Sequence, residues 1–475
     1  MERNAGKVTV VGLARSGVGA ANLLARRGAE VTVTDRKPAA QLREQAAMLQ
    51  PSVRLSLGSH PEELFTAADL VVVSPGVPMD IAPLGLARSR GIPVIGELEL
   101  AYEICQEKGT RARDSFLAVT GANGKSTTTT LLDFIMRKAG FSTILAGNIG
   151  NALSEELNKR GFGTAGKEAP LPDFVVLEVS SFQLEAIREF RPHVASLLNI
   201  TPDHLDRYHS LAEYASAKAR IFERQDDHDL LVLNADDPET VRLCADQEKK
   251  RVAGMPQVFF FSRMKEVRGV YCSGGIIYAD LTAGGGAGRR RLMAAGEVAI
   301  KGVHNLENAM AAAAMALLAG CPDGAVIDAL REFRGLEHRL EFVRELGGVR
   351  YFNDSKGTNV GAVIKSLESF TEPLILIAGG RDKAGDFSAL RDLVSQRVKT
   401  LVLIGEASGK IRDALADVTE AVLARDLGDA VTIARSRAAA GDVVLLSPAC
   451  ASFDMFRDFE DRGRQFKEIV RGLNG

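Results

Sequence analysis

The sequence predicts an α/β protein of three domains, each built on a sheet of mainly parallel strands. The chain has 475 residues, enough for about three domains of roughly 150 residues each. Short apolar runs alternate with helical segments along most of the chain. Many of these runs end in glycine-rich or polar loops, as the strands of open parallel sheets do. We expect the domains to span residues 1–107, 108–335 and 336–475.

Composition restricts the class of protein. Hydrophobic residues make up 46% and charged residues 25% of the chain, and the net charge is -2. No general attraction to nucleic acid or to a membrane surface is therefore expected. Five scattered cysteines without C-x-x-C spacing argue against a disulfide framework or a zinc site and favour a reducing cytoplasm. The apolar runs are too short to span a bilayer, and the chain enters a strand at once, so we expect no signal peptide.

The first block begins like a Rossmann unit. An apolar strand at 8–11 leads into a glycine-rich turn at 12–19, and a second strand at 30–35 ends in Asp35. The dinucleotide fingerprint would need a middle glycine where this chain has Ala14, which restricts the approach of a pyrophosphate. This weakens an NAD interpretation and leaves a nucleotide-sugar diphosphate possible. Asp35 fits a ribose or base contact, although it could equally be a residue of the strand-end turn.

Two further features of this block complete its outline. A strand at 69–74 ends in a Ser-Pro-Gly-Val loop at residues 74–77, at the sheet edge where open α/β sheets bind ligands. The polar stretch 106–114 has no apolar pattern, and we expect it to be the linker to the second block.

The second block opens with a phosphate-binding turn. Residues 115–120 read as a buried strand and 128–140 as a helix with a glycine at its end, and residues 121–127 between them contain Gly-Lys-Ser-Thr. Such a turn points backbone N–H groups and the positive end of a helix dipole at an anion. Lys125 adds a charge, and Ser126 or Thr127 a hydroxyl for Mg²⁺. The first glycine lies closer to Lys125 than in the general pattern, so the loop is a shorter variety; the alternative is an ordinary strand–helix turn.

Other polar residues of this block lie at strand ends or helix starts. Glu178 is the one acid in an apolar strand at 173–181, where a metal contact is a better explanation than an unpaired core acid. His204, in a loop after the next strand, could contact a ligand or could be a surface residue. Lys218 looks like an ordinary solvated helix lysine. Asn305 and Asn308 share the first turn of an alanine-rich helix and should face one ligand. The arginines at 289–291 should be solvated, in a region of hairpins at the domain edge.

The third block returns to strand–helix alternation. Apolar runs at 349–352, 374–378, 400–404 and 442–446 each lead into a polar or glycine-rich loop. This predicts a second open parallel sheet of Rossmann type with its ligand loops on one edge. The block has no Gly-Lys-Ser of its own, so we expect it to supply residues to a site built elsewhere.

Taken together in order, these motifs resemble the Mur ligase family of ATP-dependent, amide-forming enzymes of peptidoglycan synthesis. The resemblance covers nearly the whole chain and is closest to the members that add D-glutamate. Besides the phosphate loop, the motifs that carry it are Gly147–Gly150 as Gly-Asn-Ile-Gly, residues 178–185, residues 203–208, His304 with Asn305 and Asn308, His338 with Arg339, residues 353–356 and residues 447–453. Ala122 departs from the threonine common in relatives, at a position that contacts phosphates through its backbone.

The resemblance implies a set of site residues. ATP would be bound by Gly121, Ala122, Asn123, Gly124, Lys125, Ser126, Thr127, Asn305, Asn308, Arg339 and Asp354. Catalytic roles are implied for Lys125, Glu178, His204, Lys218 and Lys356. Two Mg²⁺ ions are expected, with Ser126, Glu178, His204 and Lys218 as metal residues and Lys218 as a carbamate. UDP-N-acetylmuramoyl-L-alanine would be bound by Arg15, Ser16, Asp35, Arg36, Ser74, Gly76, Asn148 and His204. D-Glutamate would be bound by Thr358, Lys383, Ser452, Phe453 and Phe459.

The implied reaction has two steps, acyl phosphate formation from ATP and attack by the D-glutamate amine, after closure of the domains. The resemblance also implies a cytoplasmic monomer that uses small-molecule substrates and binds neither nucleic acid nor membrane. The nearest alternatives are a sister ligase for another amino acid and a folylpolyglutamate synthase. Alternatives from other classes are an NAD-dependent oxidoreductase and a phosphate-loop switch protein that ligates nothing.

Overall fold

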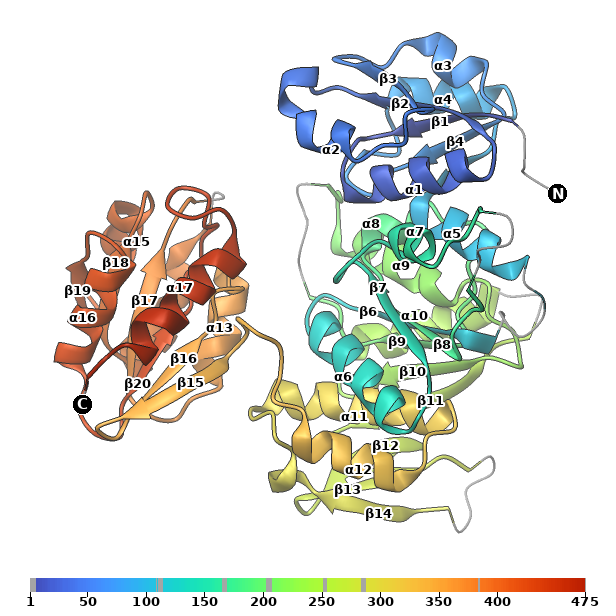
Figure 1. The fold of residues 1–475 in the computed structure, drawn as a ribbon. Coiled ribbons are helices and arrows are strands. Elements are labelled where there is room, and N and C mark those ends of the chain that lie inside the picture. Colours follow the sequence, from blue (N-terminus) through green and yellow to red (C-terminus); the bar gives the residue numbers. More distant parts are fainter. Residues whose placement is uncertain are drawn as a thin grey trace. The chain divides into compact units, whose positions relative to one another are not determined.

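The computed structural model describes residues 6–107, 109, 114–164, 169–201, 207–250, 254–282, 288–382 and 385–474. The chain forms two compact units. Unit 1 comprises Met1–Val298 and His304–Phe333, and unit 2 comprises Ala299–Val303 and Arg334–Gly475. Unit 1 contains two sheets and unit 2 contains a third, so the described chain has the predicted α/β architecture with mainly parallel sheets (Figure 1).

The first sheet of unit 1 is fully parallel, with the order β3-β2-β1-β4-β5. Its strands are β1 (Lys7–Val11), β2 (Glu30–Asp35), β3 (Arg54–Leu57), β4 (Leu70–Val73) and β5 (Val94–Gly96). Its helices are α1 (Arg15–Arg26), α2 (Arg43–Ala47), α3 (Glu62–Thr66) and α4 (Ala82–Ser89). Gly17 lets α1 approach the turn after β1, because a Cβ there would lie 1.9 Å from the carbonyl oxygen of Gly12.

The second sheet has nine strands in the order β14-β13-β12-β11-β10-β9-β6-β8-β7. It is parallel from β7 to β12 and antiparallel from β12 to β14. The parallel strands are β6 (Phe116–Thr120), β7 (Thr143–Gly147), β8 (Phe174–Glu178), β9 (Val194–Leu197), β10 (Leu230–Asn234), β11 (Gln257–Ser262) and β12 (Gly269–Ser273). The edge strands β13 (Ile276–Asp280) and β14 (Arg290–Ala294) confirm the predicted hairpin region. Arg289, Arg290 and Arg291 are exposed, as predicted.

Eight helices of the described chain accompany this sheet: α5 (Glu97–Gln106), α6 (Lys125–Lys138), α7 (Leu153–Lys159), α8 (Ser181–Leu184), α9 (Leu211–Ala219), α10 (Pro238–Lys250), α11 (Val303–Leu318) and α12 (Asp323–Glu332). One hydrophobic cluster runs through both sheets of unit 1, from Val10 to Phe190 and Leu231. The two sheets are also tied by Glu99 in α5, which is fully buried and accepts the backbone N–H groups of Arg188, Glu189 and Phe190.

Unit 2 holds a six-stranded sheet in the order β15-β16-β20-β17-β18-β19, parallel except for the antiparallel edge strand β15. The strands are β15 (Glu341–Leu346), β16 (Val349–Asn353), β17 (Leu374–Gly379), β18 (Val398–Ile404), β19 (Glu420–Leu423) and β20 (Val443–Leu446). The helices are α13 (Val360–Glu368), α14 (Arg391–Arg397), α15 (Ser408–Leu415), α16 (Leu427–Arg437) and α17 (Phe459–Arg471). The sequence did not predict β15 or β19, because their apolar runs are short: Phe-Val in β15 and Ala-Val-Leu in β19.

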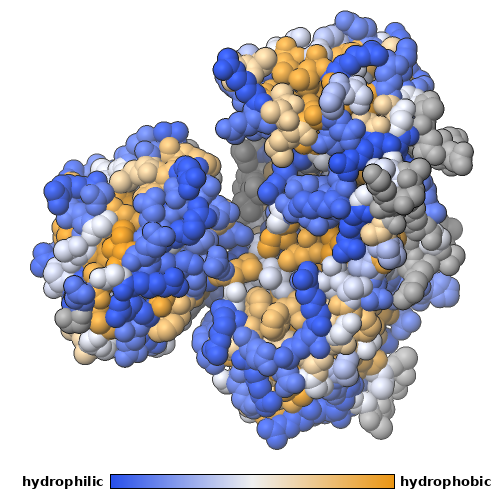
Figure 2. All heavy atoms as spheres, viewed as in Figure 1, coloured by the Kyte–Doolittle hydropathy of each residue, from blue (hydrophilic) through white to orange (hydrophobic). Residues whose placement is uncertain are grey.

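The visible surface of both units is mostly polar, with apolar residues in scattered places (Figure 2). Large exposed apolar side chains include Met48, Met264 and Phe342. In the part of the chain that the structure describes, each helix is too short or too polar to cross a membrane.

Candidate active site

The predicted phosphate loop joins β6 to α6. Gly124 occupies the N-cap of α6 with φ of 84°, a left-handed conformation that favours glycine. A side chain at Gly124 would also collide with Asn308, since its Cβ would lie 2.2 Å from the Asn308 Oδ1. The loop therefore leads into the N-terminus of a 14-residue helix, where backbone N–H groups favour an anion.

Lys125 lies over the loop that precedes it. Its Nζ donates to the carbonyl oxygens of Gly121 (2.8 Å) and Ala122 (2.9 Å). The ammonium is thus held on the inner side of the loop, where a phosphate bound at the helix N-terminus would meet it. Ser126 and Thr127 are both buried in the first turn of α6.

Asn199, a residue that the sequence argument missed, holds the phosphate loop in shape. Its Oδ1 accepts the backbone N–H of Asn123 (2.8 Å), and its Nδ2 donates to the carbonyl of Asn123 (3.1 Å). The carbonyl of Asn199 accepts the N–H of Ala122 (3.0 Å). The signal available in the sequence was a lone amide side chain just after the apolar strand β9.

Asn305 and Asn308 are side-chain neighbours on the first turns of α11. The Asn308 Nδ2 donates to the Asn305 Oδ1 (3.3 Å), and the Asn308 Oδ1 accepts the hydroxyl of Thr128 (3.3 Å). Asn308 is buried against Gly124. The pair therefore borders the phosphate loop, whichever part of a nucleotide it contacts.

Glu178 is the buried acid that the sequence singled out. It ends β8 beside Val119, the residue of β6 just before the phosphate loop. Its Oε1 accepts the Asn148 side chain (2.7 Å), whereas its Oε2 is buried and has no hydrogen-bond partner among the described residues. A carboxylate oxygen is rarely left in this state unless a cation or water completes it, so Glu178 suits a metal ligand.

Lys218 is 1% exposed, so the expectation of a solvated helix lysine is wrong. Its Nζ donates to the carbonyl of Gly121 in the phosphate loop (2.8 Å) and lies 4.5 Å from the centre of the Tyr214 ring. Helical spacing could not reveal this, because the neighbours of Lys218 come from a strand-end loop far away in the sequence. His204 lies outside the described residues.

Among the described residues, no group of three or more His, Cys, Asp or Glu side chains could hold a metal ion. Among the predicted metal residues that the structure describes, Glu178 is the one with a His, Cys, Asp or Glu side chain. Ser126 carries a hydroxyl and Lys218 an amino group.

Most of the described residues that are predicted to bind a UDP-linked substrate lie at the carboxyl edge of the first sheet. Asn148 belongs to the Gly147–Gly150 turn, which Arg15 contacts. The Asp35 carboxylate accepts the N–H groups of Leu13 and Lys37 (both 2.8 Å). Ser74 is buried and donates to the carbonyl of Gly12 (2.9 Å), so its side chain shapes the turn after β1. Arg15 donates to the carbonyl of Gly150 (2.6 Å), which brings α1 to the Gly147–Gly150 turn. Ser16 is half-buried, whereas Arg36, Gly76 and Asn148 are exposed.

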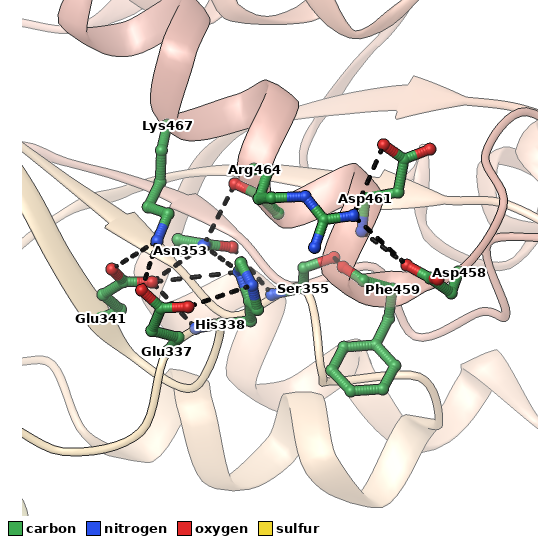
Figure 3. Close-up of polar contacts among 11 residues, drawn as sticks. Glu337, His338, Glu341, Asn353, Ser355, Asp458, Phe459, Asp461, Arg464 and Lys467 are labelled. Carbon is green, nitrogen blue, oxygen red and sulfur yellow. Dashed lines mark hydrogen bonds and ion pairs between the residues drawn. The ribbon is translucent and has the colours of Figure 1, made fainter.

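The third-block motifs meet around the end of β16 and α17 in unit 2. His338 is buried, and its Nδ1 lies 2.9 Å from the Asn353 Nδ2, which also donates to the Glu341 carboxylate (3.1 Å) (Figure 3). The Lys467 ammonium bonds the other oxygen of Glu341 (2.9 Å). Burial, with the nearby positive charge of Lys467, lowers the pKa of His338, so the imidazole stays neutral near pH 7.

Asp354 forms the buried centre of the neighbouring loop. Its Oδ2 accepts the hydroxyls of Ser366 and Ser447 (both 2.6 Å), and its Oδ1 accepts the N–H of Leu340 (3.3 Å). Burial raises the pKa of this carboxyl, while Arg339, which is half-buried, acts in the opposite direction. Within the described chain the non-glycine residues with positive φ are His338, Leu340 and Ala449, all in these loops, and such strain is common at functional sites.

Of the residues predicted to bind D-glutamate, Thr358, Ser452 and Phe453 lie in loops at the same edge of this sheet. Ser452 is buried, and its carbonyl accepts the N–H groups that begin the turn toward α17, whose N-cap is Asp458. Asp458, and not Ser452, therefore caps α17. Phe453 is exposed and is no core residue.

Three further predicted residues belong to this group. Phe459 is half-buried at the start of α17, and the Nζ of Lys356 lies 5.7 Å from its ring centre. Thr358 follows in the loop after β16 and is half-buried. Lys383 lies outside the described residues.

Arg462 was missed by the sequence argument and organises these loops. It is fully buried and donates to the hydroxyl and carbonyl of Ser355 (both 2.9 Å) and to the carbonyl of Cys450 (3.3 Å). Burial lowers its pKa to about 10, so it remains a cation near neutral pH. The sequence did contain a sign of this role. Arg462 lies on the same face of α17 as the core residues Phe466 and Val470, and charged residues are rarely buried without a partner.

With the geometry established, comparison with known proteins places the chain in a family. Three family models match successive segments: the Mur ligase MurD-like N-terminal domain at residues 6–96, the Mur ligase middle domain at 119–316 and the Mur ligase glutamate ligase domain at 338–450. A protein of Geotalea daltonii, named UDP-N-acetylmuramoylalanine–D-glutamate ligase, is 49% identical over 100% of this chain and 99% of its own length.

The chain belongs to the Mur ligase family. Its fold is similar to the UDP-N-acetylmuramate–alanine ligase of Thermotoga maritima, with a TM-score of 0.57 at 20% identity over 98% of this chain and 99% of that chain. It is also similar to a MurF ligase of Thermotoga maritima solved in complex with ADP, with a TM-score of 0.57 at 16% identity over 85% and 95%. The predicted class of enzyme, an ATP-dependent Mur ligase, and the predicted fold class are confirmed.

Proposed function

We propose that this Mur ligase joins D-glutamate to UDP-N-acetylmuramoyl-L-alanine with ATP as the energy source. The observation that carries the proposal is the 49% identity, over the whole chain, to a relative named for that reaction. The glutamate ligase domain model over residues 338–450 supports the choice of amino acid. The same proposal places the domain boundaries between residues 107 and 108 and between residues 335 and 336. It also includes a cytoplasmic location and action as a monomer.

The ATP phosphates are proposed to bind at residues 121–127. The helix N-terminus, the left-handed Gly124 and the inward ammonium of Lys125 support this, because together they supply N–H donors and positive charge at one point. Asn305 and Asn308 border the loop from α11 and are proposed to contact the adenosine. Arg339 and Asp354 of unit 2 are proposed to contribute to the same nucleotide.

Glu178 is proposed to hold Mg²⁺ together with the hydroxyl of Ser126. The unpartnered, buried Oε2 of Glu178 fits a hard cation, which prefers carboxylate and hydroxyl oxygens. A bound Mg²⁺ supplies charge that offsets the negative charge of the phosphates. His204 and Lys218, the latter as a carbamate, are proposed to serve a second ion. The burial of Lys218 beside Gly121 supports its place at the site.

The UDP-linked substrate is proposed to bind along the carboxyl edge of the first sheet. Arg15, Ser16, Asp35, Arg36, Ser74, Gly76, Asn148 and His204 are the proposed binding residues. The exposed Gly76 and Arg36, at two neighbouring strand ends, support this placement, since open α/β sheets bind nucleotides at that edge. The missing middle glycine at Ala14 does not oppose it.

D-Glutamate is proposed to bind in unit 2 through Thr358, Lys383, Ser452, Phe453 and Phe459. The loops that carry Thr358 and Ser452 are tied together by the buried Arg462, which bonds Ser355 in one and Cys450 in the other. Lys356, close to the Phe459 ring, is proposed to take part in catalysis.

In the first step the substrate carboxylate attacks the γ-phosphorus of ATP and forms an acyl phosphate, while the bond to the β–γ bridging oxygen breaks and ADP leaves. Lys125 lowers the barrier because its charge offsets the repulsion between the two anions. In the second step the D-glutamate amine attacks the activated carbonyl, and phosphate leaves. The attacking amine must be neutral, so a proton has to pass to a nearby base.

The test is product analysis. Purified protein is incubated with ATP, Mg²⁺ and UDP-N-acetylmuramoyl-L-alanine, with and without D-glutamate, and the products are identified by mass spectrometry. The proposal expects an amide adduct and one ADP per adduct with D-glutamate. An adduct that forms only with L-glutamate, L-lysine or diaminopimelate refutes D-glutamate while keeping a sister ligase. ATP hydrolysis without any adduct refutes the ligase reaction.

A further inference from the structure

The loop after β4, residues 74–77, is joined to the second sheet of unit 1 by one side chain. The Arg207 Nη1 donates to the carbonyl of Pro75 (3.2 Å), and its Nη2 donates to the carbonyl of Val77 (3.4 Å). These two carbonyls flank Gly76. The same Nη2 also donates to the Glu185 carboxylate (2.5 Å), just beyond α8. One guanidinium therefore bridges the loop of the first sheet and the helix that follows β8.

Arg207 is itself held in place by the second sheet's domain. Its guanidinium carbon lies 4.3 Å from the centre of the Phe182 ring, which fixes the plane of the side chain. The second oxygen of Glu185 accepts the hydroxyl of Tyr208 (2.5 Å). The Tyr208 ring in turn stacks on Phe182, with centroids 6.1 Å apart. The Arg207 and Glu185 side chains are each 18% exposed, so this ion pair is partly desolvated.

The loop depends on Arg207 at its tip. Its base is fixed, because the Ser74 N–H bonds the carbonyl of Val11 (2.9 Å) and the Val77 N–H bonds the carbonyl of Ser74 (3.0 Å). Behind the base lies a cavity of about 10 Å³ that Phe182 helps to line, roughly the space of a single water. At Gly76, by contrast, nothing lies within 4 Å of where a Cβ would be. The two bonds from Arg207 thus hold the carbonyls of Pro75 and Val77, while the Val77 side chain also packs against the cluster around Val11 and Val73.

We propose that Arg207 is a positioning residue for the UDP-linked substrate, acting by holding the residue 74–77 loop in its binding conformation. This rests on the proposed function, which places that substrate against Ser74 and Gly76. Arg207 acts through the loop because both terminal nitrogens already bond protein oxygens. An arginine suits the task, since its planar fork reaches two carbonyls and a carboxylate at once, which a lysine cannot do.

The experiment compares wild type with Arg207→Ala and Arg207→Lys. Hydrogen exchange at the Val77 amide reports on the loop without substrate, calorimetry reports binding of UDP-N-acetylmuramoyl-L-alanine, and steady-state kinetics report KM for that substrate and for ATP. Arg88→Ala is the matched control. Arg88 also donates to a carbonyl close by, that of Met79 (2.8 Å), but from α4 of the same sheet's domain.

We expect Arg207→Ala to speed Val77 exchange and to raise both Kd and KM for the UDP-linked substrate about tenfold, equal to about 1.4 kcal/mol. KM for ATP and the melting temperature should stay near wild type, Arg207→Lys should fall between, and Arg88→Ala should change none of them. Unchanged Val77 exchange overturns the proposal, and so does an equal rise in KM for ATP or an equal effect of Arg88→Ala. If the wild-type protein makes no D-glutamate adduct, the proposed reaction is refuted. Hydrogen exchange at Val77 and calorimetry with the UDP-linked substrate still test the role of Arg207 in that case.

Discussion

Replacing Glu178 with glutamine tests the metal site at a single atom. The variant keeps the shape of the side chain and an oxygen for the Asn148 amide, which bonds Glu178 Oε1 at 2.7 Å. It removes the negative charge from Oε2, the buried oxygen with no partner among the described residues. Any loss of function therefore reports on that charge rather than on packing.

Two effects of opposite sign follow from this geometry. A metal that polarises a phosphoryl oxygen is worth several kcal/mol in the transition state. At about 1.4 kcal/mol per factor of ten, turnover of Glu178→Gln should fall about 10²- to 10³-fold. Folding should not suffer in the same way, because a lone buried carboxylate disfavours the folded state. The melting temperature without ligand should therefore be equal to or above that of wild type.

The assay is phosphate release over a range of Mg²⁺ concentrations, together with thermal unfolding. Glu97→Gln is the matched control, because Glu97 is also a buried glutamate of unit 1 with one oxygen bonded, to the Ser154 N–H at 2.7 Å, and the other without a partner among the described residues. Glu97→Gln should leave the Mg²⁺ dependence unchanged. Turnover of Glu178→Gln within threefold of wild type at every Mg²⁺ concentration would refute the assignment.

Three more predictions concern other parts of the site. Gly124→Ala should abolish ATP binding, because the new Cβ meets Asn308 at 2.2 Å and φ is 84°; tight nucleotide binding by calorimetry would contradict this. Lys218→Ala should be nearly inactive and partly rescued by added short carboxylates if a carbamate acts there, and activity without rescue would count against it. Burial lowers the pKa of His338, so the folded chain binds fewer protons than the unfolded chain as pH falls below about 6.5. Stability should decline below that pH, more steeply in wild type than in His338→Asn, and equal slopes in urea unfolding would exclude the effect.

Much of the fold was predictable because parallel strands buried on both faces leave apolar runs. The strand at 115–120 and the helix after it follow from local sequence alone, although the helix begins at Lys125 and not at residue 128 as predicted. Edge strands such as β15 were missed because their exposed side chains carry no such pattern. Glu178 could be predicted as a site residue because an acid in an otherwise apolar strand breaks the local pattern.

The remaining site residues depend on contacts that local patterns do not encode. Lys218 looked solvated because its helix is short and its partner, the carbonyl of Gly121, lies 97 residues away. Asn199 and Arg207 bond backbone carbonyls and amides in loops that follow other strands. A pattern of side chains in the sequence does not predict such contacts. Family resemblance supplied Lys218, whereas Asn199, Arg207 and Arg462 needed the structure.

The measurement that tests the central claim most directly is a competition among amino acids. The protein receives UDP-N-acetylmuramoyl-L-alanine, ATP and Mg²⁺ with an equimolar mixture of D-glutamate, L-glutamate, L-lysine and meso-diaminopimelate, and mass spectrometry and chiral analysis quantify each adduct. A D-glutamate ligase should give the D-glutamate adduct in about 10²-fold or greater excess, because a ligand of the other handedness or of another length cannot pair both carboxylates and present its amine at once, and leaves polar groups of the site unpaired. A majority of any other adduct would contradict the account.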